Sequence, residues 1–208
     1  MLSPKEINDY KDGTSKTLVF FAGSCCVYDD PLRYFEKYLP DVRNILQFSE
    51  DLQRNGSKIV DRLMRTHSNC MCIHIRMTDF VDRNISTDMT ATVRAASDIA
   101  KKKNISQFLI FGDHERFMRA MAKKIVEEGH WKANAVLISE FNEPMDLYVA
   151  SRMCKAFLIA AVTLSFGWWL AFFISDQTAV YYLPDTRKHG DKVPSKELFL
   201  KSWQQYSG

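Results

Sequence analysis

The sequence lacks the glycine-rich loops that mark the common nucleotide-binding folds. Neither a GxGxxG fingerprint nor a Walker-type loop occurs in its 208 residues, which excludes the usual dinucleotide-binding and P-loop sites. It also has no Cys-x-x-Cys motif, and its five histidines are scattered without the spacing of metal ligands. We therefore expect a site that uses no bound metal and no cofactor.

An excess of one charge sign is also missing. The 28 basic and 25 acidic residues give a formal net charge of +3, and the only basic run is the lysine triplet at 101–103. That triplet ends an apolar repeat with helical spacing, where cations on the last turn favour the helix dipole. The charge balance therefore indicates no nucleic-acid partner, while a hydrophobic content of 46% is enough for a folded core.

Five cysteines cannot all pair with one another inside the chain. Cys25 and Cys26 are adjacent, Cys70 and Cys72 would share one face of a strand, and Cys154 falls at the end of an expected helix. Free cysteine is among the residue types that are buried most often. We therefore interpret all five as small buried hydrophobic residues in preference to metal ligands.

The first residues, MLSPKEINDYKDG, are polar, so we expect neither a signal peptide nor a membrane anchor before the fold. Three Asn-x-Ser sequons begin at Asn55, Asn84 and Asn104, and they permit N-glycosylation if the chain enters the secretory pathway. Such triplets also occur by chance, so the sequence alone does not decide the compartment.

An uncharged run, AFLIAAVTLSFGWWLAFFIS at 156–175, has two possible structures. As a single helix it could cross a hydrocarbon core of about 30 Å. As two elements it would form a strand buried on both faces and then a helix that packs on the sheet. We prefer two elements, because Ser165 and Gly167 suit a helix cap and a close approach in mid-run. Trp168 and Trp169 also lie far from the interfaces that tryptophan favours in spanning helices.

From residue 70 onward, apolar strands alternate with amphipathic helices. The expected strands are 71–77, 107–112, 134–139, 156–164 and 178–183, and the expected helices are 90–103, 115–128, 143–154 and 166–175. This alternation predicts a mostly parallel sheet with helices on both faces. In such a sheet the ligand lies at the C-terminal ends of the strands.

The first third of the chain has a less regular pattern. We expect a strand at 17–23, a helix at 32–39 closed by Pro40, a strand or extended segment at 42–48, and a helix at 50–67 that Gly56 weakens. These elements have α/β character but are too few to close a domain of their own.

Two polar groups fall at the expected strand ends. His74 and Arg76 alternate onto one face at the end of the strand at 71–77, and Asp79 lies just beyond, where it could hold a loop by accepting backbone N–H bonds. The planar fork of Arg76 suits a diphosphate. The alternative is an ordinary ion pair between Arg76 and Asp79.

The second group is Ser165, Phe166 and Gly167, at the start of the helix expected at 166–175. A serine cap leaves free N–H groups at the helix N-terminus, and a glycine in the first turn lets a ligand approach the backbone. The alternative is a simple cap, with Phe166 in the core.

Four blocks of the sequence are HIRMTDF, LIFGDHERF, MDLYVASRMCKAFLIAAVTLSFGWWLAFF and QTAVYYLPD. In this order they resemble the C-terminal half of the family 11 glycosyltransferases, the galactoside α-1,2-fucosyltransferases, especially a divergent nematode-type branch. The similarity covers roughly residues 65–205. It implies a GT-B enzyme, inverting and metal-independent, that transfers fucose from GDP-fucose to the 2-hydroxyl of a galactoside.

The resemblance also implies roles for single residues. His74, Arg76 and Asp79 match the family's H-x-R-R-x-D element, in which the first arginine contacts the donor diphosphate, so Arg76 is the predicted catalytic residue. Met77 stands where the family usually has a second arginine, and Thr78 where it often has glycine. This departure removes one positive charge beside the expected phosphate site.

Three further matches follow from the same resemblance. Residues 165–167 correspond to the family's T-F-G, and Asp146 to an acidic residue that helps to hold the guanosine. Asp113 and His114 lie in a loop that resembles the family's second strand-end element. The implied substrates are a nucleotide sugar and a galactose-containing glycan.

The predicted fold class is α/β and GT-B-like, with a nearly complete Rossmann-like domain at 66–208 and the remnant of an acceptor-side α/β domain at 1–65. The resemblance implies the Golgi or secretory pathway, with membrane association only through the family's N-terminal anchor, which we expect this chain to lack. One alternative is a catalytically weak or inactive nucleotide-sugar-binding paralogue, favoured by Met77 and the short N-terminal part. The other is a single-pass membrane protein that spans 156–175.

Overall fold

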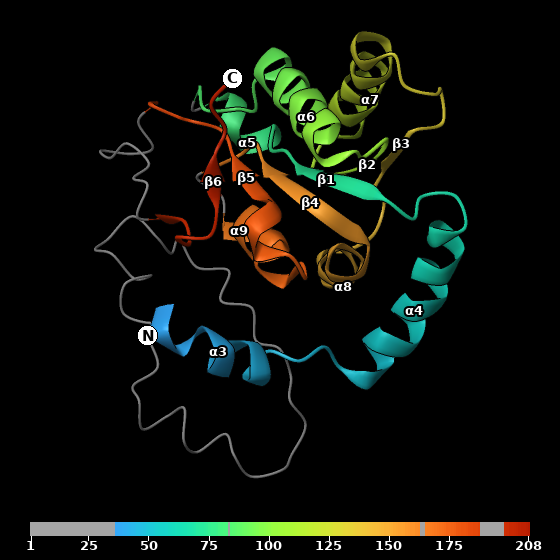
Figure 1. Cartoon of the computed structure of the whole chain (residues 1–208), viewed down its shortest axis with the longest axis vertical. Helices are drawn as coiled ribbons and strands as arrows, with labels where there is room; N and C mark the ends of the chain where they lie inside the picture. Colours follow the sequence, from blue (N-terminus) through green and yellow to red (C-terminus); the bar gives the residue numbers. More distant parts are fainter. Residues whose placement is uncertain (1–35, 83, 163–164, 188–197) are drawn as a thin grey trace.

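The computed structural model describes residues 36–82, 84–162, 165–187 and 198–208 (Figure 1). They form an α/β fold around one six-stranded sheet with the strand order β3-β2-β1-β4-β5-β6. The strands are β1 (Cys70–His74), β2 (Gln107–Phe111), β3 (Val136–Ile138), β4 (Cys154–Ile159), β5 (Val180–Tyr182) and β6 (Gln204–Gln205). Every pairing is parallel. This is the Rossmann order, which reverses direction between β1 and β4.

Helices cover both faces of the sheet (Figure 1). One face carries α6 (Met89–Lys103) and α7 (Glu115–Gly129), and the other carries α8 (Glu143–Met153) and α9 (Ser165–Phe173). The short α5 (Thr78–Val81) follows β1, and two 3-10 turns lie at Glu36–Tyr38 and Gln177–Ala179. The α/β class, the parallel sheet and the predicted alternation of strands and helices are confirmed. Strand β6 and helix α5 were not predicted.

Strand β1 lies at the centre of the sheet, and its composition fits that position. All five of its residues are buried, because helices cover both faces and strands flank both edges. A parallel strand in this position is expected to be apolar throughout and not alternating. His74, at its last position, is the polar exception.

The uncharged run at 156–175 divides into strand β4 and helix α9, as preferred from the sequence. Its strand is completely buried from Ala156 to Ile159. The helix buries Gly167, Leu170 and Phe172 against the sheet side. Among the residues that the structure describes, no helix is long and apolar enough to cross a membrane.

The prediction for 42–48 was wrong over its first half. Helix α3 (Leu39–Ile45) begins where the preceding helix was expected to end, with Pro40 in its first turn. Proline is well tolerated there because the first-turn N–H groups have no partner inside the helix. Leu39, Val42 and Leu46 recur at helical spacing and pack against the core. The strand expected at 17–23 lies outside the described residues.

Helix α4 (Glu50–Met64) confirms the helix expected from residue 50, with Ser49 as its N-cap. Gly56 does not mark a weak point of this helix but a close approach to α8. A Cβ atom on Gly56 would lie 2.2 Å from Cδ1 of Tyr148. Phe48 also meets Tyr148, with ring centroids 5.3 Å apart. The described part of the first 65 residues thus packs on the helices of the sheet, and the boundary at 65 stays a prediction.

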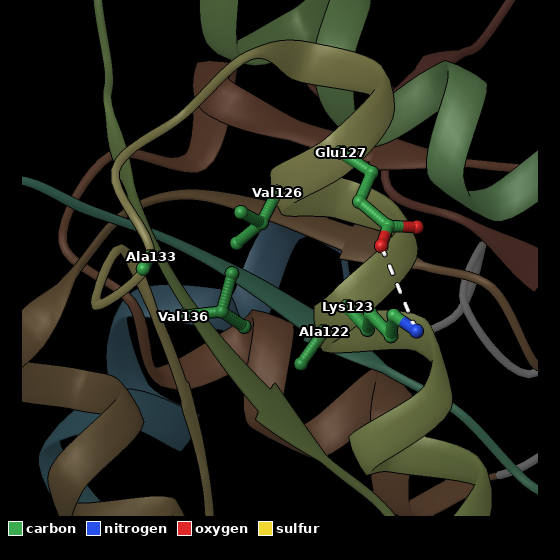
Figure 2. A pocket seen from close by; sticks show the side chains of 6 residues that line it. All are labelled: Ala122, Lys123, Val126, Glu127, Ala133 and Val136. Atoms are coloured by element: carbon green, nitrogen blue, oxygen red, sulfur yellow. Dashed lines mark ion pairs between the residues drawn. The ribbon is translucent and has the colours of Figure 1, made fainter.

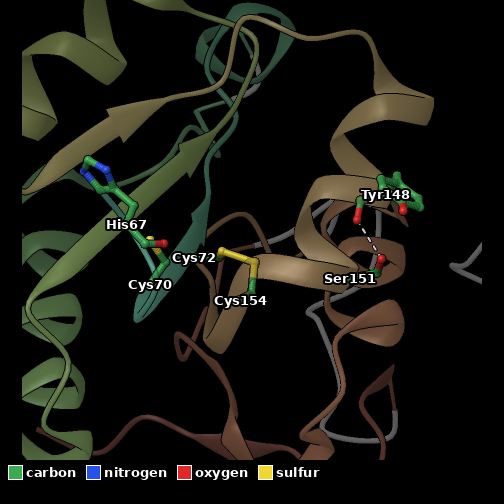
Figure 3. The surroundings of a disulfide bond; sticks show 6 residues. All are labelled: His67, Cys70, Cys72, Tyr148, Ser151 and Cys154. Carbon is green, nitrogen blue, oxygen red and sulfur yellow. Dashed lines mark hydrogen bonds between the residues drawn. A yellow bond between two sulfur atoms is a disulfide. The ribbon is translucent and has the colours of Figure 1, made fainter. Parts of the chain in front are cut away.

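Two of the cysteines are not free hydrophobic residues, which corrects the prediction. Cys72 of β1 and Cys154 of β4 form a disulfide with a Cα–Cα distance of 5.5 Å (Figure 3). Cys70 fits the prediction: it is a buried free thiol whose Sγ donates to the carbonyl of His67 at 3.3 Å. Burial raises the pKa of Cys70 to about 12, so this thiol stays protonated. Cys25 and Cys26 lie outside the described residues.

Replacing Cys154 by serine should lower the free energy of unfolding by about 2 to 5 kcal/mol, because the crosslink restricts a long loop in the unfolded chain. The two cysteines are 82 residues apart in sequence. Urea unfolding without reductant measures the loss. Cys70→Ser, which leaves the disulfide intact, is the matched control and should lose less. Equal stability of Cys154→Ser and the oxidised wild type would contradict the crosslink.

Candidate functional site

The strand order reverses between β1 and β4, and in a doubly wound sheet this is where a crevice opens at the carboxyl ends of the strands. His74 ends β1 and lies in register with Phe111 of β2 and Ile159 of β4. The amide of Ala160 donates to the carbonyl of His74 at 3.1 Å. The polar residues that follow β1 and β2 and those that open α9 therefore meet at one edge.

His74 is a buried polar side chain with an unmet hydrogen-bonding atom. It is 2% exposed, and its Nδ1 has no hydrogen-bond partner among the residues that the structure describes. Burial, together with the nearby charge of Arg76, lowers the pKa of His74 to about 3, against the opposing effect of Asp113. The imidazole is therefore neutral at physiological pH.

The ring of His74 packs directly on the first turn of α9. It meets Phe166 edge to face at a centroid distance of 5.7 Å. A Cβ atom on Gly167 would lie only 2.3 Å from Nδ1 of His74. The glycine is thus required for this approach. The structure brings His74 together with Phe166 and Gly167.

Helix α9 begins at Ser165 itself, one residue before the predicted start. Ser165 is exposed, and Leu164, the residue before it, lies outside the described residues. The first N–H groups of any α-helix have no partner within the helix and carry its positive dipole end. The start of α9 is therefore suited to an anion at the edge where His74 lies.

Arg76 is held at its backbone and at its side chain. Its amide donates to Oγ1 of Thr87 at 2.9 Å, and its carbonyl accepts from the amide of Thr87 at 3.0 Å. Its guanidinium Nε lies 3.1 Å from Oδ2 of Asp113, and the side chain is 31% exposed. Arg76 therefore forms an ion pair with Asp113. The predicted ion pair with Asp79 involves a side chain that the structure does not describe.

Asp113 organises the segment after β1. Its carboxylate accepts from the amides of Met77 at 2.9 Å and Thr78 at 3.0 Å, and also from the hydroxyl of Thr78. Burial alone would raise the pKa of Asp113, but these bonds and the charge of Arg76 together hold the pKa below its usual value. This loop-holding role was predicted for Asp79. In the sequence, the feature that could have pointed to Asp113 is its position just beyond the C-terminal end of β2, the strand next to β1.

Two other residues near this edge are structural. His114 caps α7, with Nδ1 accepting from the amide of Phe117 at 3.1 Å.

Arg187 binds the carboxylate of Asp185 through Nε at 2.9 Å and Nη2 at 2.7 Å. Its Nη1 donates to the carbonyl of Ser86 at 2.8 Å, so the segment after β5 supports the loop that contains Thr87. Sequence reasoning did not find Arg187.

Asp146 lies apart from the His74 group. It sits in the first turn of α8, is 6% exposed, and bonds with the hydroxyl of Ser139, just after β3. Burial raises the pKa of Asp146 to about 7, although the bond from Ser139 opposes the shift and Glu143 adds to it. Strand β3 is two strands from β1, a separation of about 10 Å.

A cavity of about 310 Å³ opens elsewhere, between α7 and the edge strand β3 (Figure 2). Its walls are mostly apolar, and an ion pair between Lys123 and Glu127 at 3.7 Å crosses the α7 side. It is lined by Ala122, Lys123, Val126, Glu127, Ala133 and Val136. None of these belongs to the group around His74, and Val136 begins β3 at the opposite end from the crevice.

No protein-family model matches the chain. A Caenorhabditis elegans protein named as a glycosyltransferase is 26% identical over 98% of this chain and 64% of its own length. Two C. elegans proteins named as galactoside 2-α-L-fucosyltransferases are 25% and 27% identical, over 83% and 86% of this chain. The chain resembles galactoside 2-α-L-fucosyltransferases. The resemblance predicted from the sequence is thereby confirmed.

The chain spans only part of these relatives, from 51% to 64% of their length. Among solved structures, POFUT1 in complex with GDP matches with a TM-score of 0.47 and 8% sequence identity. That match covers 62% of this chain and 45% of the other.

Gly167→Ala tests the contact between α9 and His74. In a helix this change normally stabilises by about 1 kcal/mol. Here the added methyl would meet Nδ1 of His74, so we expect destabilisation of about 1 to 3 kcal/mol by overpacking. Urea unfolding measures it. In a His74→Ala background the same change should be neutral or stabilising, and stabilisation of the wild type would show that the contact is wrong.

Asp146→Asn tests the buried carboxyl. Because the folded-state pKa is raised to about 7, the stability that this group contributes is complete below its unfolded pKa and is lost as pH rises through 7. Between pH 4 and 7 the wild type should lose up to about 4 kcal/mol relative to Asp146→Asn, at about 1.4 kcal/mol per pKa unit. Chemical unfolding at several pH values measures this. Glu143→Gln, which keeps the Asp146 carboxyl, should retain the loss, and parallel pH profiles of wild type and Asp146→Asn would disprove the shift.

Proposed function

We propose that this chain supplies the donor-binding part of a fucosyltransferase, which transfers fucose from GDP-fucose to the 2-hydroxyl of a galactoside. One observation carries the proposal: the unpartnered Nδ1 of buried His74 faces the first turn of α9 where the strand order reverses. Arg76 lies two residues further on. The names of the C. elegans relatives support the choice of fucose and galactoside.

The proposed chemistry is an inverting, metal-independent transfer, as the resemblance implies. The acceptor hydroxyl oxygen attacks the anomeric carbon and releases its proton to solvent, the bond from that carbon to the phosphate oxygen breaks, and GDP leaves with the electron pair. Negative charge then grows on the diphosphate. Arg76 and the N–H groups at the start of α9 are the proposed stabilising groups, since fixed donors aimed at developing charge lower the barrier.

The remaining predicted residues have places in the same proposal. Asp146 is assigned to the guanine base, which would extend from the diphosphate at β1 across β2 toward Ser139 and α8. The separation of about 10 Å across two strands is within the reach of a nucleoside diphosphate. Ser165, Phe166 and Asp79 are assigned to the donor side. The proposed location is the secretory pathway.

A second candidate is a protein that binds the nucleotide sugar without transferring it. Met77, which replaces the family's second arginine, is half-buried and packs against the hydrophobic core. The chain also spans only 64% and 51% of the length of two of the relatives. GDP release from GDP-fucose in the presence of a β-galactoside separates the two candidates: transfer requires release, and the second candidate predicts binding alone.

Arg76→Ala should weaken GDP-fucose binding by about 2 to 4 kcal/mol, because it removes charge-assisted bonds to the diphosphate. Arg76→Lys should recover only part of this, since an ammonium cannot make the planar two-point contact. Calorimetric titration of GDP-fucose into each folded variant measures the change.

Arg54→Ala is the matched control for this titration. Arg54 lies on α4 in an exposed ion pair with Asp51 at 3.3 Å, so its removal should leave the affinity unchanged. Parallel titrations with GDP, ADP and UDP test guanine recognition, for which GDP alone should bind tightly. Unchanged affinity in folded Arg76→Ala, or equal affinity for the three nucleotides, would refute the proposed donor site.

A further inference from the structure

The three sequons differ in their local structure. Asn55 lies inside α4, and the next residue, Gly56, is pressed against the ring of Tyr148. Asn84 and Asn104 instead stand in exposed turns outside helices, with φ values of 55° and 54°. Asparagine glycosylation requires a surface segment, so the turns are better acceptors than the helix interior.

The turn at Asn104 presents its sequon to solvent. Asn104 ends α6 in the left-handed conformation, and its amide donates to the carbonyls of Ala100 and Lys101. Ile105, the middle residue of the sequon, is 3% exposed and anchors the turn in the core. Asn104 and Ser106, on either side of it, are both exposed. The amide that would accept the sugar and the hydroxyl that the sequon requires are therefore accessible together.

The position of Asn104 also separates it from the candidate site. It precedes β2, whose first residue is Gln107, and so lies at the amino edge of the sheet. The His74 group lies at the carboxyl edge. Asn84, by contrast, leads into Ser86 and Thr87, which bind Arg187 and Arg76. A glycan on Asn104 would leave the crevice open, whereas one on Asn84 would stand beside it.

The disulfide supplies an independent observation about the compartment. Bonds such as Cys72–Cys154 form and persist in oxidising compartments, including the lumen of the endoplasmic reticulum. Oligosaccharides are attached to asparagine in that same lumen. We propose that Asn104 carries an N-linked glycan. This inference does not depend on the transfer reaction proposed above.

The modification is a glycosyl transfer to the side-chain amide. The amide nitrogen of Asn104 forms a bond to the anomeric carbon of an oligosaccharide carried on a lipid diphosphate. The bond from that carbon to the diphosphate oxygen breaks, and the lipid diphosphate leaves with the electron pair. The amide gives up one proton to a base of the cell's oligosaccharide-transferring enzyme. Ser106 supplies the hydroxyl that the sequon requires.

The test expresses the full chain in animal cells behind a cleavable leader that directs it into the secretory pathway. Treatment with peptide-N-glycosidase converts a glycosylated asparagine to aspartate, which mass spectrometry locates. We expect conversion at residue 104 and a gel shift that the enzyme removes. Ser106→Thr should keep the modification, and Ser106→Ala should abolish it while the residue that ends α6 stays the same.

Two further variants separate a glycan acceptor from a simple helix cap. Asn104→Gly keeps a residue suited to the left-handed cap, so it should fold, and it should lose the part of the shift that a glycan on residue 104 contributes. Ser57→Ala destroys the sequon at Asn55 and should leave the shift unchanged. The proposal is overturned if Asn104 is recovered unmodified from folded, secreted protein with the Cys72–Cys154 disulfide formed, because Asn104 would then serve only to end α6.

Discussion

The parallel pairing of β1 with β4 is the constraint on which the rest of the structure depends. It joins segments that are about 80 residues apart in sequence, it fixes the point where the strand order reverses, and the Cys72–Cys154 disulfide crosslinks it. The pairing also sets His74 level with Ile159, so that α9, which follows β4, starts directly over the imidazole. Burying a ring with an unmet nitrogen is costly. The neighbouring pairing and the crosslink therefore hold a contact that local preferences would not produce.

The electrostatics of the site follow from that burial. A neutral His74 brings no charge to the crevice, so the positive groups at this edge are the guanidinium of Arg76 and the N-terminal end of the α9 dipole. Arg76 is oriented by Asp113, whose carboxylate also holds the amides of Met77 and Thr78. A partly exposed ion pair of this kind contributes little to stability. Its main effect is to fix the direction of the guanidinium relative to the segment that follows β1.

Much of the fold was predictable, because strands and helices differ in the local spacing of their apolar residues. The division of 156–175 into β4 and α9 could be read from a serine and a glycine in mid-run. Features that depend on contacts between residues far apart in the sequence could not be predicted from it. The disulfide joins two cysteines from separate strands, Asp113 acts on a loop 35 residues earlier in sequence, and β6 consists of two glutamines without an apolar pattern. Helix α3 was missed because Val42, Leu46 and Phe48 would also fall on one face of a strand at 42–48.

Met77 shows why a motif is an incomplete description of a site. In the sequence, methionine stands where the family usually has arginine, which removes a positive charge beside the expected phosphate site. In the structure the residue contributes through its backbone, whose N–H binds Asp113, while its side chain packs against the core. An arginine at this position would have to leave the core packing to reach the crevice. The departure from the motif therefore changes packing as well as charge, and in the proposed donor site the positive side chain is that of Arg76, which the Asp113 carboxylate orients.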